Sequence, residues 1–115
     1  LVMEARLGLA MVNEKMGRVT DTMDELNLLV EMFPDSAVTW AARATFETTR
    51  KQYDMALYDW SEAISRAPQN ADYVVSQADV LLTLGRRDEA RKQLYAAVGR
   101  GIPRGVLHEW IAKCK

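Results

Sequence analysis

Residues 37–68 read AVTWAARATFETTRKQYDMALYDWSEAISRAP. Two segments of this stretch carry apolar side chains at helical spacing, and a short polar break around residues 50–52 separates them. The small side chains of Ala44 and Ala56 allow two helix backbones to approach closely, while Trp60 fills the space between them. The stretch therefore predicts two helices that fold back on each other as a hairpin.

The hairpin recurs along the chain with a fixed period, marked by Pro34 and Pro68, which are 34 residues apart. A period of this size is the sequence signature of stacked structural repeats. The same step aligns small residues with small residues and large apolar residues with large apolar residues. The columns are Ala10, Ala44 and Ala78; Thr22, Ala56 and Ala90; Val12, Phe46 and Val80; Leu26, Trp60 and Leu94; Val30, Ile64 and Val98.

Residues that end and begin helices keep the same period. Gly17 and Gly85 share a column in which a left-handed residue can end a helix, and Lys51 is the third occupant. The helix-ending residues and the core columns follow the same 34-residue period, so two independent kinds of sequence pattern predict the same fold. The expected N-cap residues are Thr20, Asp54 and Asp88 in one column and Ser36 and Asn70 in another.

These patterns predict one all-α domain over residues 1–115, with no β-strand. Three hairpins are expected, and a seventh, capping helix follows them over residues 105–113. Its apolar stripe is expected to consist of Val106, Leu107, Trp110, Ile111 and Cys114. The six hairpin helices are expected near 2–15, 20–32, 36–50, 54–66, 71–84 and 88–99.

The middle unit carries a run of residues that resembles the tetratricopeptide repeat (TPR) in order and spacing. This resemblance covers residues 3–103, as repeats of about 3–36, 37–70 and 71–103 with a capping helix near 105–114. The middle unit matches best, and the first is the most degenerate, with Arg6 where Trp40 stands in the second. The matching residues are Trp40, Ala44, Tyr53, Ala56, Trp60, Ala63 and Pro68.

The resemblance implies a right-handed superhelix whose concave groove, lined by the first helix of each hairpin, takes a peptide or a helix of another protein. The groove chemistry is mixed apolar and acidic. One TPR subgroup clamps the carboxylate at the end of chaperone peptides, but Asp72 and Asp79 would repel that group, so this chain is not expected to bind chaperone tails. The implied groove residues are Leu7, Met11, Val38, Ala41, Thr45, Asp72, Val75 and Asp79, and the resemblance also places Glu4, Ala42, Thr48 and Ser76 on this face.

The first helix is apolar on nearly every side, whereas a terminal repeat should have a polar outer face. We expect this face to be covered, either by an upstream repeat of a longer chain or by a second copy in a homodimer. A structural module that self-associates through this helix is therefore the alternative to a binding scaffold. The residues assigned to self-association are Leu1, Val2 and Leu9.

The composition argues against several other classes of function. A net charge of −1 gives no overall attraction for nucleic acid, although Arg86, Arg87, Arg91, Lys92, Arg100 and Arg104 concentrate positive charge locally. His108 and Cys114 lie six residues apart on different sides of a helix, so they cannot share a metal ion. No catalytic residues, metal, cofactor or membrane span are expected. The single thiol, Cys114, fits a reducing cytoplasm without requiring one.

Overall fold

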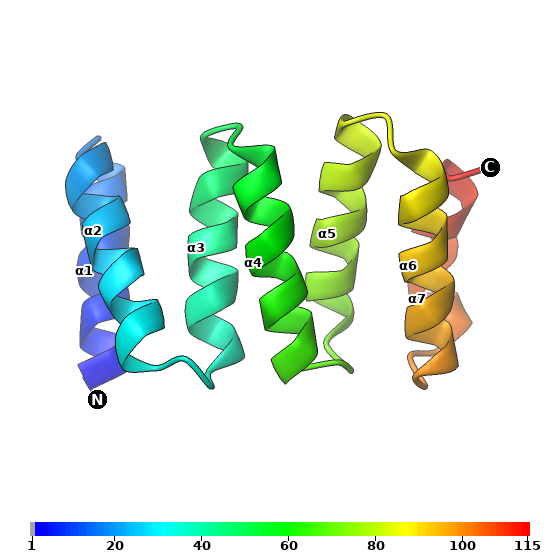
Figure 1. The fold of residues 1–115 in the computed structure, drawn as a ribbon, viewed down its shortest axis with the longest axis horizontal. Coiled ribbons are helices and arrows are strands. Elements are labelled where there is room, and N and C mark those ends of the chain that lie inside the picture. Colours follow the sequence, from blue (N-terminus) through cyan, green and yellow to red (C-terminus); the bar gives the residue numbers. More distant parts are fainter. Residues whose placement is uncertain (1) are drawn as a thin grey trace.

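The computed structural model describes residues 2–115, and within that range the chain is helical with no strand (Figure 1). The all-α prediction is therefore confirmed, and each helix boundary falls within one residue of its predicted position. The helices are α1 (Val2–Lys15), α2 (Val19–Met32), α3 (Ala37–Thr49), α4 (Tyr53–Arg66), α5 (Ala71–Thr83), α6 (Arg87–Gly99) and α7 (Arg104–Lys113).

The three pairs of helices follow one another in chain order along the longest axis of the molecule, which measures 39 Å (Figure 1). Each helix packs against the next, so that α1 and α2, α3 and α4, and α5 and α6 form three hairpins. The last helix, α7, packs on both α5 and α6 and closes the C-terminal end of the stack.

The turn inside each hairpin has the same geometry in all three units. Gly17, Lys51 and Gly85 have φ angles of 74, 61 and 76°, in the left-handed region, as the column of helix-ending residues predicts. In each turn the next backbone N–H donates to a carbonyl five residues earlier; for Arg86 and Leu81 the distance is 2.8 Å. This bond satisfies one of the carbonyls left open at the end of the first helix.

The predicted N-caps are only partly correct. Asn70 caps α5, because its side chain accepts a hydrogen bond from the Tyr73 N–H at 3.2 Å. Ser36 occupies the N-cap position of α3 without a capping bond from its side chain. Thr20, Asp54 and Asp88 are not N-caps, since their helices begin one residue earlier, at Val19, Tyr53 and Arg87. All three lie in the first turn, where the negative charges of Asp54 and Asp88 interact favourably with the helix dipole.

The core follows the predicted columns in the second and third units but not throughout the first. The small residues Ala44, Ala56, Ala78 and Ala90 are fully buried between helices. Val12 is the exception, since its side chain is 52% exposed while those of its column partners Phe46 and Val80 are 5% and 2% exposed. Those partners are covered by the preceding hairpin, and no described segment covers Val12.

Hydrogen bonds to the carbonyls of Pro34 and Pro68, which end the first two units, add a second contact between hairpins. The Arg66 side chain donates from Nε to the carbonyl of Pro34, and Arg100 donates in the same way to Pro68. Arg66 also lies over the Trp40 ring, with its guanidinium carbon 4.6 Å from the ring centre. The end of one hairpin is thus held by the last helix of the next.

The capping helix differs from its predicted stripe at one position. Leu107, Ile111 and Cys114 are buried against α5 and α6, and Trp110 packs at the edge of this cluster. Val106 is exposed, because a residue next to Leu107 points about 100° away around the helix.

Candidate peptide-binding groove

A cavity of about 380 Å³ opens between α1 and α3. Four of the eight groove residues inferred from the sequence, Leu7, Met11, Val38 and Thr45, lie around it. Most of its other lining atoms are apolar, which suits an apolar side chain better than a charged one. The full lining is Leu7, Ala10, Met11, Glu14, Thr22, Leu26, Val38, Ala42, Thr45 and Phe46.

Helical spacing explains how two distant segments line one cavity. On α1, Leu7 and Met11 are four residues apart, and on α3, Val38 and Ala42 are also four residues apart, so each pair lies on one face. The cavity floor is the N-terminal core cluster, in which Phe46 packs with residues of α1 and α2. The walls are therefore fixed by the packing of three helices.

The structure places Ala41 differently from its neighbours in the inferred set. Its side chain is buried in the central core cluster with Trp40 and Ala44, so it offers little surface to a ligand. Ala42, the next residue, which the resemblance also placed in the groove, does line the cavity. One step along a helix changes direction by about 100°, which is enough to move a side chain from groove to core.

The three inferred residues of α5 lie outside this cavity. Asp72 and Asp79 are exposed, and Val75 is half-buried against the C-terminal core cluster. With intervals of three and four residues, the three side chains form one stripe along α5. The groove residues thus divide into an apolar part on α1 and α3 and an acidic part on α5.

In every ion pair among the described residues, the acid lies on the second helix of a hairpin. The acids of the groove, Asp72 and Asp79 among them, have no ion-pair partner in residues 2–115. The paired acids are Glu25 on α2, Asp59 and Glu62 on α4, and Asp88 and Glu89 on α6.

A buried charged cluster, which the sequence analysis did not identify, joins α3 and α4. Arg43 donates two hydrogen bonds to the buried carboxylate of Asp59 and a third to the Asn27 side chain. Glu47 is buried beside them, and its Oε1 has no hydrogen-bond partner within the described residues. Burial and, after it, the neighbouring Asp59 carboxylate raise the pKa of Glu47 to about 8.

A signal for this cluster exists in the sequence. Glu47 lies three residues after Ala44 and seven after Trp40, so helical spacing places it on the buried face of α3. An acid at such a position requires a partner or a proton. The cluster borders an open cavity of about 390 Å³ between α2, α3 and α4, which also includes Asn27, Met55 and Tyr58.

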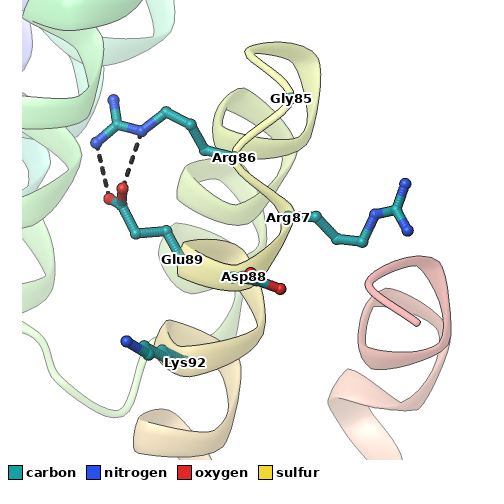
Figure 2. A pocket seen from close by; sticks show the side chains of 6 residues that line it. All are labelled: Gly85, Arg86, Arg87, Asp88, Glu89 and Lys92. Carbon is teal, nitrogen blue, oxygen red and sulfur yellow. Dashed lines mark hydrogen bonds and ion pairs between the residues drawn. The ribbon is translucent and has the colours of Figure 1, made fainter.

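The basic residues at the start of α6 do not form one continuous patch. Figure 2 shows Arg86 and Arg87 pointing to opposite sides of the helix start, with Arg86 paired to Glu89. Arg87 extends toward the C-terminus, where it donates to the Lys115 carbonyl at 3.3 Å. Arg91 is paired with Asp88. Neighbouring carboxylates thus offset much of this positive charge.

Residues 2–115 contain no group of three or more His, Cys, Asp or Glu side chains arranged to hold a metal ion. None of the described helices has the length and apolar character needed to cross a membrane.

No family model matches the chain, and no curated protein sequence matches it. Solved structures do share its fold. The type III secretion chaperone SycD of Yersinia enterocolitica, in complex with a peptide of the translocator YopD, is 18% identical, with a TM-score of 0.77 over 98% of this chain and 86% of that one.

Two further structures extend this comparison. The TPR2B domain of yeast Sti1, in a complex with pHsp70, is 15% identical, with a TM-score of 0.78 over 97% of this chain and 94% of that one. The TPR domain of Arabidopsis OM64 is 14% identical, with a TM-score of 0.72 over 84% of this chain and 79% of that one. The hairpin stack therefore defines an α-solenoid protein. In its fold, the chain is a TPR-like protein.

Proposed function

We propose that this protein is a non-enzymatic interaction scaffold that binds a peptide or a segment of a partner protein in the groove lined by α1, α3 and α5. The observation that carries the proposal is the apolar cavity between α1 and α3, which three helices hold open in the folded chain. A preformed, mostly apolar concavity with a few polar groups at its edge is typical of a ligand site.

Two structures with the same fold support the proposal by analogy. SycD was solved with a peptide of the translocator YopD, and the Sti1 domain was solved in a complex with pHsp70. At 18% and 15% identity, these likenesses concern the fold. The partner of this chain has to follow from its own groove residues.

A Thr45→Arg variant tests the proposal. Thr45 lines the cavity, and its hydroxyl makes only a local bond to the Ala41 carbonyl at 2.8 Å, so the substitution places a long charged side chain in the groove at little cost to the fold. Ser65→Arg on α4 is the matched control, since it makes an equivalent change at an exposed hydroxyl outside the groove.

Partners that the wild-type chain captures are identified by mass spectrometry. Binding of the same partners to each variant is then measured, after thermal unfolding has shown that both variants are folded. We expect Thr45→Arg to lose the partners and Ser65→Arg to keep them. If both variants retain every partner, the groove is not the binding surface.

A second candidate function, self-association through α1, is favoured by a specific observation. Val12 is largely exposed, although the equivalent Phe46 and Val80 are covered by the preceding hairpin. Val2 and Leu9, both assigned to self-association, are also exposed, whereas Leu1 lies outside the described residues. This face of α1 thus has the geometry of an interface between hairpins, but no hairpin within residues 2–115 covers it.

Sedimentation equilibrium over a hundredfold range of concentration tests the second candidate. A dimer that forms at high concentration and is abolished by Leu9→Glu with Val12→Glu would support it, with Met55→Glu on α4 as the exposed apolar control. A constant monomer mass at every concentration would rule out self-association.

A further inference from the structure

The acidic stripe of α5 has no internal source of positive charge. Asp72 and Asp79 are seven residues apart, so they lie on the same face of the helix, about 10 Å apart along its axis. The whole of α5 (ADYVVSQADVLLT) contains no Lys, Arg or His. Both carboxylates are exposed.

The surrounding elements do not neutralise these carboxylates either. The five ion pairs of the described residues join Arg6, Arg43, Arg66, Arg86 and Arg91 to acids of α2, α4 and α6. On α1, Glu14 adds another acid at the edge of the apolar cavity. An unneutralised acidic surface favours a ligand that brings positive charge.

One row of groove positions changes from apolar to acidic along the repeats. Met11, Thr45 and Asp79 occupy the same position in successive first helices, and the row changes from a thioether to a hydroxyl to a carboxylate. A segment lying along this row meets the apolar cavity at α1 and α3 before it meets the carboxylates of α5.

We infer that the groove selects a segment of a partner protein that carries a large apolar residue and, a few positions away, a Lys or Arg. This inference rests on the proposed function. Both α3 and α5 pack on α4, and packed helices lie roughly 10 Å apart, so the centre of the cavity is about 15 Å or more from α5. An extended chain covers that distance in four or five residues at about 3.3 Å per residue. The apolar side chain fills the cavity, and the basic side chain pairs with Asp79 or Asp72.

Selection from a phage library of random 12-residue peptides tests the inference. Against the wild-type chain we expect a consensus with Leu, Ile, Met or Phe and a Lys or Arg four to six positions away. Against Asp72→Lys with Asp79→Lys, the basic position should become Asp or Glu, while the apolar position persists. Asp21→Lys with Asp24→Lys, which reverses two exposed acids of α2, should leave the consensus unchanged.

Affinities of one selected peptide provide a second measurement, which also applies if the Lys variant does not fold. Replacing both acids by Asn should weaken binding a few-fold at low salt, because it removes one exposed ion pair, and should weaken it less at high salt. A consensus without a basic residue, or one that charge reversal does not alter, would overturn the inference and leave the proposed function standing. If no selected peptide depends on Thr45, the proposed function itself fails.

Discussion

The guanidinium of Arg43 holds both carboxylate oxygens of Asp59, with Nε and Nη2 each 2.8 Å from an oxygen. This bidentate pair crosses from α3 to α4 inside the middle hairpin, and the Asp59 side chain is buried. A buried pair of this kind demands both partners, because either charge left alone in the interior is strongly unfavourable.

We therefore predict that Arg43→Ala lowers the free energy of unfolding by about 3–5 kcal/mol, since it leaves Asp59 buried without a counter-ion. The matched control is Arg6→Ala, which removes the more exposed pair with Glu25 and should cost under about 1 kcal/mol. Urea unfolding followed by circular dichroism measures both. Equal losses in the two variants would show that burial does not govern this pair.

Glu47 should make stability depend on pH. Its pKa is about 8 in the folded chain and near the ordinary value of 4.5 when unfolded, so the folded state retains a proton that the unfolded state loses. The contribution of the neutral acid is fully present below pH 4.5 and declines as the pH rises through 8. We expect the free energy of unfolding to fall by on the order of 3 kcal/mol between pH 5 and pH 9.

The Glu47→Gln variant provides the control for this pH dependence, because an amide has nearly the same shape and does not titrate. Its urea midpoint should change little over the same range and should exceed that of the wild type at pH 9. A wild-type midpoint that rises with pH would contradict the assigned direction.

Enlarging a small core residue should destabilise the stack. Ala78 is fully buried between α5 and its neighbours, so Ala78→Leu inserts three extra carbons where the helices are in contact. We expect a loss of about 1–3 kcal/mol from overpacking. Ala96→Leu, at an exposed position of α6, should be within about 0.5 kcal/mol of the wild type by the same thermal or urea measurement.

The turn of the middle hairpin can be improved. Lys51 adopts a φ of 61°, which a side chain with a Cβ tolerates poorly. Lys51→Gly should raise the free energy of unfolding by about 0.5–1 kcal/mol. Gly85→Lys makes the reverse change. Since a Cβ at Gly85 would meet no atom within 4 Å, any decrease in the urea midpoint of this variant would come from the backbone conformation alone.

The period of the sequence was sufficient to predict the helices and most of the core. Columns such as Ala44 and Ala78 repeat because each hairpin packs against the next in the same way. The same logic failed at Val12, because the column is buried only where a preceding hairpin covers it. Burial in a repeat depends on the neighbour as well as on the residue.

Other features depend on distances that spacing alone does not determine. The cluster of Arg43, Glu47 and Asp59 brings together residues of two helices, and their pairing follows from which rotamers meet between α3 and α4. The N-caps of α4 and α6 were missed by two residues because a carboxylate in the first turn resembles a cap in the sequence. Within the groove, Ala41 and Ala42 are chemically identical, and only the exact helix rotation separates them.

The uncovered side of α1 also sets where the molecule opens first. In a stack of repeats, each unit is stabilised by its own helices and by the interfaces with its neighbours. Within residues 2–115 the middle hairpin has two such interfaces, whereas α1 packs on α2 and meets α3 only at the N-terminal core cluster, and its outer side chains, such as Val12, are exposed. Amide protons of α1 should therefore exchange with deuterium sooner than those of α3 and α4. A ligand seated against Leu7 and Met11 would slow that exchange, so the rate of opening at this end of the stack directly reports occupancy of the groove.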